Sequence, residues 1–320
     1  MEIEADLTRE LAAADEKIEF AEKEQGDLEI RDALAEKAEI YKRHGDNEGF
    51  RQQLLKAIEK TIGNAKKLDY QLMILQSYYL ENNFDKFAET LKTCQKLNEE
   101  GGDWEKKNKL MVYEAVLLLV KKELAKAANL FLSCVNTFNA PEVLPYETLV
   151  AYGVLLGALT LPRSEVSEKI VGNSEILAVL FENKPLHDFL FSLYNSKYNQ
   201  YFEAFLTLQD KFVSCDKFLK PHEMLIIKRA RIVVYSQYLE SYRTVTLQKM
   251  SADFGVSLDF LDRELAELIA SRKLNCKIDK IAGIVESIKR DDKVSLFKQI
   301  TKKGDHLVER IAKLNRMAQF

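Results

Sequence analysis

Apolar residues recur every three or four positions along most of this chain, which is the spacing of amphipathic α-helices. Short polar breaks interrupt that spacing at 42–46, 81–83 and 121–123. After each break a new helix places a small or apolar residue four positions after a large apolar one, in the pairs Phe50 and Leu54, Phe84 and Ala88, and Leu124 and Ala128. The pattern predicts repeated helix-turn-helix units.

The first members of these pairs lie 34 and 40 positions apart. This is the period of tetratricopeptide-like solenoids, in which a large residue and a small one let paired helices pack closely. One helix pair cannot bury its own apolar face, whereas a stack of pairs can. We therefore expect a mostly α protein with a tetratricopeptide-like helical repeat array over residues 31–185.

The thirty residues before the array carry eleven acidic and three basic side chains. Their apolar positions still keep helical spacing, at Ile3, Leu7, Leu11, Ala14, Ile18 and Ala21. The pattern predicts an acidic N-terminal helix over 1–30 with one narrow apolar stripe. Such a helix either caps the array or docks a partner, and the sequence leaves both interpretations open.

The pattern changes character near residue 245. A short helix that ends at Gly255 is followed by a second helix, which Ser257 is expected to cap. The second helix is expected to bury one stripe, made of Leu258, Leu261, Leu265 and Leu268. Two short runs with a period of two follow, one through Cys276 and Ile278 and one through Val285. Two helices and a two-stranded hairpin predict a winged helix.

A winged helix suggests DNA binding, but the charges argue against it. Its second helix, over 257–274, carries four acidic residues against three basic ones, and the whole chain has a formal net charge of -3. Acidic side chains that face a polyanion lower affinity, so we expect no nucleic-acid partner. The exposed edge of the hairpin can instead add a strand from another protein. Cys276, Ile278 and Val285 are therefore candidate interface residues.

The last segment, 291–320, predicts a helix with an apolar seam of Leu307, Ile311, Leu314 and Ala318. A helix with such a seam at a chain end favours a partner helix, although folding back onto its own chain remains the alternative. Gly304, which precedes the seam, is expected to act as a hinge. We expect the segment to be an assembly helix.

The remaining composition gives no sign of catalysis or of a membrane. The four cysteines form no CxxC pair, and no HExxH, GxxxxGK[ST], GxGxxG or GxSxG motif occurs. We expect no enzyme activity, no metal and no cofactor. The N-terminus is acidic where a signal peptide would be basic, and no apolar run reaches the length of a membrane span. We therefore expect an intracellular protein with no membrane partner.

Several segments resemble one family of proteins. They are EEGGDW at 99–104, LMVY at 110–113, LFLS at 130–133, LFSLY at 190–194, YSQYLESYR at 235–243 and CKIDK at 276–280. Together they resemble the family of the seventh non-ATPase subunit of the proteasome 19S regulatory particle lid. That family belongs to the PCI proteins of the proteasome lid, the signalosome and translation initiation factor 3. The resemblance covers the chain from about residue 30 to its C-terminus.

The resemblance implies a right-handed repeat array joined to a PCI module over 186–290, whose winged helix begins near 245. It implies that winged helices of related subunits associate edge to edge and that the C-terminal helices gather into a bundle. The implied partners are other PCI subunits of the lid, with proteasomal ATPases as further candidates. The implied function is non-catalytic scaffolding of the lid, in cytoplasm and nucleus, for ubiquitin-dependent protein degradation. A signalosome subunit is the alternative, and an initiation factor 3 subunit is a weaker one.

Overall fold

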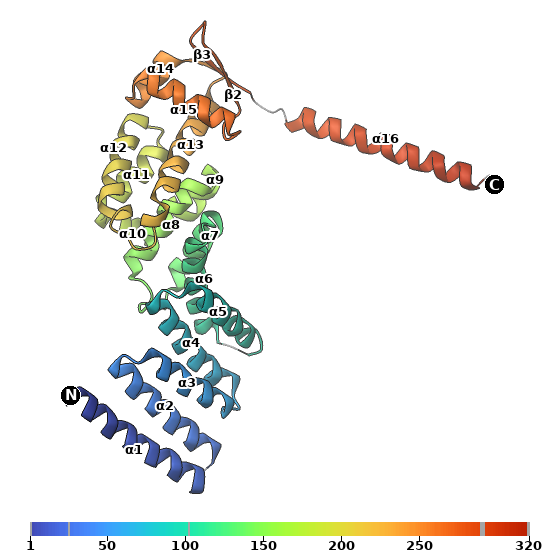
Figure 1. Cartoon of the computed structure of the whole chain (residues 1–320). Helices are drawn as coiled ribbons and strands as arrows, with labels where there is room; N and C mark the ends of the chain where they lie inside the picture. The colour runs from blue at the N-terminus through green and yellow to red at the C-terminus, as the bar shows by residue number, and fades with distance from the viewer. Residues whose placement is uncertain (1, 25, 102, 289–291, 319–320) are drawn as a thin grey trace. The chain divides into compact units, whose positions relative to one another are not determined.

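The computed structural model describes residues 2–24, 26–101, 103–288 and 292–318, and side chains from residue 10 onward except at 22–24 and 292 (Figure 1). The chain forms two compact units. The first contains Met1–Leu190 and Lys211–His222, and the second contains Phe191–Asp210 and Glu223–Phe320. The sequence predicts a boundary near 186, but it does not predict that the segment at 211–222 belongs to the first unit.

The regular secondary structure of the first unit is all helical among its described residues. Its elements are α1 (Glu2–Glu24), α2 (Asp27–His44), α3 (Asn47–Glu59), α4 (Asn64–Glu81), α5 (Phe84–Glu99), α6 (Trp104–Val120), α7 (Leu124–Cys134), η1 (Val135–Thr137), α8 (Tyr146–Thr160), α9 (Arg163–Val166), η2 (Ser167–Val171), α10 (Ser174–Glu182) and η4 (Lys220–His222). Consecutive helices pack against one another from α1 to α8 (Figure 1). The predicted helical repeat array is confirmed.

Two helices begin in one unit and end in the other, namely α11 (Lys184–Tyr194) and η3 (Gln209–Val213). The second unit also contains α12 (Tyr198–Leu208), α13 (Glu223–Ser241), β1 (Thr244–Thr246), α14 (Leu247–Phe254), α15 (Leu258–Ala270), β2 (Cys276–Asp279), β3 (Ile284–Ser287) and α16 (Asp292–Ala318). Helices α14 and α15 with the strands form the predicted winged helix.

The turns within three helix pairs share one geometry. Gly45, Asn82 and Lys122 adopt the left-handed conformation, with φ of 81°, 60° and 66°. In each case the next residue donates its backbone N–H to a carbonyl five positions earlier, at 3.0–3.1 Å. This arrangement satisfies carbonyl groups that the end of a helix leaves free. Ser196, between α11 and α12, has φ of 59° and repeats the arrangement in a turn that the sequence pattern does not reveal.

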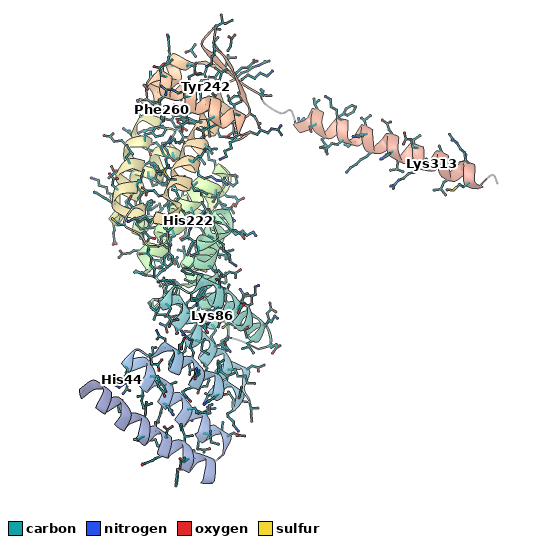
Figure 2. All side chains as sticks on the ribbon, viewed as in Figure 1. His44, Lys86, His222, Tyr242, Phe260 and Lys313 are labelled. Carbon is teal, nitrogen blue, oxygen red and sulfur yellow. The ribbon has the colours of Figure 1, made fainter. Side chains whose placement is uncertain are left out.

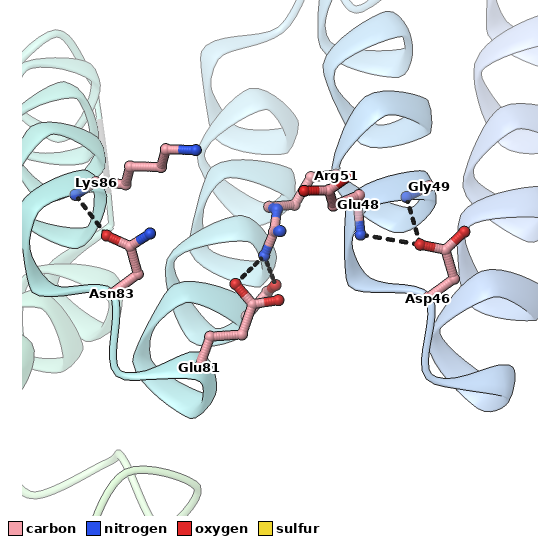
Figure 3. Close-up of polar contacts among 8 residues, drawn as sticks. Asp46, Glu48, Gly49, Arg51, Glu81, Asn83 and Lys86 are labelled. Carbon is pink, nitrogen blue, oxygen red and sulfur yellow. Dashed lines mark hydrogen bonds and ion pairs between the residues drawn. The ribbon is translucent and has the colours of Figure 1, made fainter.

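Side chains then start the second helix of each of the first two pairs (Figure 3). Asp46 accepts hydrogen bonds from the backbone N–H groups of Glu48 and Gly49 at 3.1 and 3.0 Å, and Asn83 accepts one from Lys86 at 3.4 Å. These polar residues occupy the predicted breaks because they satisfy backbone donors that the first helical turn leaves free. The chemistry of the breaks therefore explains the ends of the helices.

The residues that the repeat pattern singles out do not all lie in the core. Phe50 with Leu54 and Leu124 with Ala128 are buried, as predicted. Phe84 and Ala88 are only half-buried, so this pair lies at the edge of the core. Helix α5 instead buries Phe87, Leu91 and Cys94. Phe84 lies beside this face, with its ring centroid 6.5 Å from that of Phe218, a residue of the returning segment 211–222.

Helix α1 packs on α2 through Ala14 and Ala21, which are buried. Ile3 and Leu7 of the predicted stripe lie outside the described side chains. Lys17 bonds Glu36 at 2.7 Å, and Lys37 pairs with Asp15, so ion pairs cross between the two helices. The narrow apolar stripe of α1 therefore contacts the first helix of the array.

Phe254, the last residue of α14, lies at the centre of the second unit's core. Its ring centroid is 5.0–5.8 Å from those of Tyr198, Phe202, Tyr235 and Tyr238. Tyr201 and Phe205, from the same aromatic segment, are buried. The spacing of three and four in this aromatic segment favours core packing over a base-stacking surface, and the burial of Tyr201 and Phe205 agrees with it.

The wing differs from its prediction in having three strands. Strand β3 lies in the centre and pairs antiparallel with β1 and β2. Val245, Val285 and Ile278 lie opposite one another across the sheet. The sequence pattern misses β1 because three residues are too few to show a period of two. Among the described residues, no helix is both long enough and apolar enough to cross a membrane.

Candidate assembly surfaces

Strand β2 forms one edge of the sheet and presents backbone groups rather than a row of apolar side chains. The N–H of Ile288 bonds to the carbonyl of Asn275 at 2.9 Å, which makes those two residues a hydrogen-bonded pair. In an antiparallel ladder hydrogen-bonded pairs alternate with pairs that are not hydrogen-bonded. The next hydrogen-bonded pair is therefore Lys277 with Glu286, and Lys277 directs its N–H and C=O groups toward β3. The backbone groups of Cys276 and Ile278 therefore point outward along the edge.

The candidate interface residues of the wing are not equally accessible. The side chains of Cys276 and Val285 are buried, and that of Ile278 is half-buried. All three lie on the inner face of the sheet, since Val285 pairs with Ile278 and Ser287 with Cys276. Burial also raises the pKa of the Cys276 thiol to about 11. Their side chains thus support the edge from within, while the backbone of two of them forms it.

Helix α15 occupies the place of the groove-reading helix in a DNA-binding winged helix, and most of its acidic residues are bound within the chain. Glu264 accepts hydrogen bonds from Arg231 and Tyr235 on α13, at 2.6 and 2.7 Å. Glu267 pairs with Lys228 at 2.6 Å, and Asp262 pairs with Lys280 at 3.0 Å. Much of the polar surface of α15 therefore joins it to the rest of the module.

Two expectations about α15 are wrong. Ser257 occupies the position before the first helical residue, but its side chain makes no capping hydrogen bond. It contributes its backbone carbonyl, which accepts from Leu261 N–H at 3.1 Å. Leu258 is 40% exposed, whereas Leu261, Leu265 and Leu268 are buried. Leu258 is the first residue of the helix, where the chain enters it, and Phe260 beside it is exposed as well (Figure 2).

Helix α16 is amphipathic but buries none of its described side chains. From Lys293 to Ala318 every residue is exposed, including the predicted seam of Leu307, Ile311, Leu314 and Ala318. Gly304 does not break the helix, which continues through it, so the predicted hinge is wrong. One glycine costs a helix interior about 1 kcal/mol relative to alanine, which twenty-six other helical residues can tolerate.

The described residues hold little that points to chemistry. No group of three or more His, Cys, Asp or Glu residues among them is placed to hold a metal ion. His222 is buried, and desolvation lowers its pKa, with Lys122 contributing in the same direction. Tyr152 donates a 2.5 Å hydrogen bond to Asp216, but burial raises the pKa of this tyrosine far above its usual value. These groups hold segment 211–222 in place.

Comparison with known proteins identifies the family. The model of the 26S proteasome subunit RPN7 family matches residues 1–169, and that of the PCI domain matches 203–289. The chain is 42% identical to the 26S proteasome non-ATPase regulatory subunit 6 homolog of Arabidopsis thaliana, over 96% of the chain and 79% of that protein. It is 39% identical to the 26S proteasome non-ATPase regulatory subunit 6 of Oryza sativa, over 99% of the chain and 81% of that protein.

A more distant relative gives the same result. The 26S proteasome regulatory subunit RPN7 of Saccharomyces cerevisiae is 32% identical, over 93% of the chain and 70% of that protein. The resemblance of the segments between 99 and 280 to this family is thereby confirmed, and the described winged helix falls within the PCI match. The chain belongs to the family of 26S proteasome subunit RPN7.

Proposed function

We propose that this chain is a non-catalytic structural subunit of the lid of the 26S proteasome regulatory particle. It scaffolds lid assembly for ubiquitin-dependent protein degradation, as part of a complex in the cytoplasm and nucleus. The proposal rests on the chain's close relation to proteasome regulatory subunits. The observation that carries it is α16, an amphipathic helix of 27 residues whose described side chains all remain exposed.

The exposure of α16 supports an assembly role because a solvated apolar seam is costly. Leu307, Ile311 and Leu314 are 59–63% exposed. Burying each such side chain against a partner contributes up to roughly 1.5–3 kcal/mol. Since no element of the described chain covers the seam, a partner supplies that burial. Assembly through Leu307, Ile311, Leu314 and Ala318 therefore joins this subunit to helices of other PCI subunits of the lid.

The sheet edge supplies a second contact of a different kind. The outward backbone groups of Cys276 and Ile278 can pair with a strand or loop of a neighbouring winged helix, which gives lateral association between subunits. Val285 and Cys276 stabilise this edge by burial on the inner face. The seam provides apolar area and the edge provides directional hydrogen bonds, so the two contacts together select both a partner and an orientation.

The relatives named above are proteasome subunits, and nothing observed favours the signalosome or initiation factor 3. The ion pairs of α15 occupy Lys228, Arg231 and Lys280, so these cations are not free to bind phosphate groups, which supports protein rather than nucleic-acid recognition by the winged helix. Catalysis in the complex belongs to other subunits. Proteasomal ATPases are further partners within the same assembly.

Affinity purification of the tagged chain from its native cell, followed by mass spectrometry, tests the proposal. We expect lid subunits in near-equal amounts, with proteasomal ATPases at a lower level that depends on intact 26S particles. Recovery of signalosome subunits or of initiation factor 3 and ribosomal proteins in place of lid subunits would overturn it. Peptidase or deubiquitinase activity that one point mutation in this chain abolished would contradict the non-catalytic role.

A further inference from the structure

The apolar seam of α16 is longer than the four residues predicted from the sequence, and Gly304 lies within it. Because the helix is continuous, residues spaced alternately by three and four share one face. These residues are Phe297, Ile300, Gly304, Leu307, Ile311, Leu314 and Ala318. Phe297 and Ile300 are 71% and 60% exposed, as unpartnered as the rest of the seam. The seam therefore has one position without a side chain, between Ile300 and Leu307.

Nothing in the part of the chain that the structure describes explains a glycine at that position. Gly304 lies in helical backbone and does not have the positive φ that favours glycine. A Cβ atom built there would meet nothing within 4 Å. Glycine also weakens the interior of a helix relative to alanine. The reason to have no side chain at this position therefore lies with whatever packs against the seam.

The charges beside the seam indicate the chemistry of that partner. Lys303 and Arg310 lie seven positions apart along one flank, while Thr301, Val308 and Asn315 form the other flank. In paired helices these flanking positions meet the flanking positions of the partner, where opposite charges favour pairing. The helix carries seven basic and three acidic side chains in all. A partner with acidic residues beside its own seam complements the basic flank.

A second copy of α16 does not fit. In a parallel pair of copies, Lys303 and Arg310 would face the neutral flank and gain no partner. In an antiparallel pair the basic flanks would face each other, and like charges repel. The charge pattern therefore favours a helix from a different chain.

Resting on the proposed assembly role of α16, we infer that Gly304 forms a gap that receives a large apolar side chain from a partner helix with acidic residues beside its seam. The packing is of the knob-into-hole kind, in which a side chain of one helix fills a space between residues of the other. Ile300 and Leu307 border the gap along the helix. Gly304 thus determines the register in which the partner helix packs. The basic flank of Lys303 and Arg310 selects a partner helix with acidic flanking residues.

The test uses the full-length tagged chain as the sole copy in its native cell and measures the fraction that enters the lid. Gly304→Leu fills the gap and should reduce incorporation on the order of tenfold. Overpacking costs roughly the 1.4 kcal/mol of binding free energy that corresponds to a tenfold change in affinity. Leucine is a better helix former than glycine, so the loss cannot come from a weaker helix. Gln299→Leu is the control. It places a leucine at a position that is exposed like 304 but lies away from the seam, and it should leave incorporation unchanged.

Two results separate the inference from the proposed function. Leu307→Asp breaks the seam itself and should abolish incorporation. If Leu307→Asp reduces incorporation but Gly304→Leu does not, the helix assembles and the gap is unused, which overturns the inference alone. If Leu307→Asp also enters the lid at the wild-type level, α16 is not an assembly helix, and the inference fails together with that part of the proposed function.

A charge reversal tests the acidic partner. Lys303→Glu with Arg310→Glu should lower incorporation several-fold. Lys302→Glu with Lys313→Glu makes the same change in net charge away from the seam and should have little effect. Equal losses in the two double variants would show a general electrostatic effect. They would overturn the inference that the partner helix carries acidic residues beside its seam. An unchanged melting temperature of each purified variant establishes that the array remains folded.

Discussion

The phenolic oxygen of Tyr235 on α13 donates a 2.7 Å hydrogen bond to the carboxylate of Glu264 on α15. Arg231 binds the other oxygen of that carboxylate at 2.6 Å. The Tyr235 side chain is fully buried, and burial, with the nearby Glu264 charge, raises its pKa far above the usual value. The acidic residue that argues against DNA binding is therefore also part of the module's internal structure.

Glu264→Leu should loosen the contact between α13 and α15. It leaves the buried Tyr235 hydroxyl without its acceptor, which costs roughly 1–3 kcal/mol. Hydrogen exchange of α13 and α15 amides should show a lower free energy of local opening by that amount. Glu267→Leu is the matched control, because the Lys228–Glu267 pair is 44% and 67% exposed and such surface pairs contribute little to stability. Equal effects of the two variants would contradict a special role for Glu264.

Lys122→Gly should stabilise the fold by about 0.5–1 kcal/mol. Ser196→Gly should stabilise it less, because it also removes the hydrogen bond that the Gln237 amide donates to the Ser196 hydroxyl at 3.2 Å. Both residues have positive φ, at 66° and 59°, which glycine adopts without steric cost. Gly45→Ala, in the equivalent turn at φ of 81°, should have the opposite effect. The thermal unfolding midpoint measures all three. A fall in that midpoint for both glycine variants would show that entropy gained by the unfolded chain outweighs the relief of strain.

The cysteines should differ sharply in reactivity. Burial raises the pKa of Cys134 and Cys276 from 9.0 to about 11 and that of Cys94 to about 12. The thiolate is the reactive form, so these residues should resist alkylation at pH 8, whereas Cys215 is exposed and should react first. Mass spectrometry after a timed iodoacetamide treatment identifies the modified residue. Rapid modification of Cys276 in the folded chain would contradict its burial.

The same shifts predict alkaline destabilisation. The folded state holds the thiols of Cys134 and Cys276 in the neutral form, so the stability they contribute is complete below pH 9. That stability is lost as the pH rises through about 11. Cys276→Ala should therefore flatten the fall in unfolding midpoint between pH 9 and 11. A parallel pH profile for the variant and the wild type would be the contrary outcome.

Proline substitutions in β2 should distinguish the role of its free edge in association from the role of its inward hydrogen bonds in folding the hairpin. Ile278→Pro removes an outward N–H and should reduce association with a neighbouring winged helix while keeping the module folded. Ile278→Ala also loses the apolar side chain but keeps that N–H, so it is the control for packing. Lys277→Pro removes an N–H that faces β3 and should unfold the wing. Co-purification of lid subunits reports association, and if proline and alanine at 278 act alike, the edge hydrogen bonds are not the contact.

Removing residues 292–320 should leave the unfolding midpoint of the isolated chain unchanged, because every described side chain of α16 from 293 onward is exposed. The same truncation should prevent entry into the lid. Differential scanning calorimetry and native gels measure the two properties on one preparation. A clear drop in the midpoint would mean that the helix packs on its own chain in solution.

Local sequence patterns were sufficient to predict much of this fold. Polar residues at the breaks satisfy helix ends, and the three- and four-residue spacing places apolar side chains on one face, so both signals act within a few residues. The array, the winged helix and the amphipathic character of α16 follow from them. The family also follows from short segments such as those at 99–104 and 276–280.

Tertiary structure decided what depends on residues distant in the sequence. The segment at 211–222 returns to the first unit, where Phe218 stacks on Tyr79 with ring centroids 6.0 Å apart, and its spacing gives no sign of that contact. Strand β1 is defined only by its pairing with β3. Cys276 and Val285 have the same apolar character whether they face a neighbour or the inner face, so the sheet register decides their burial.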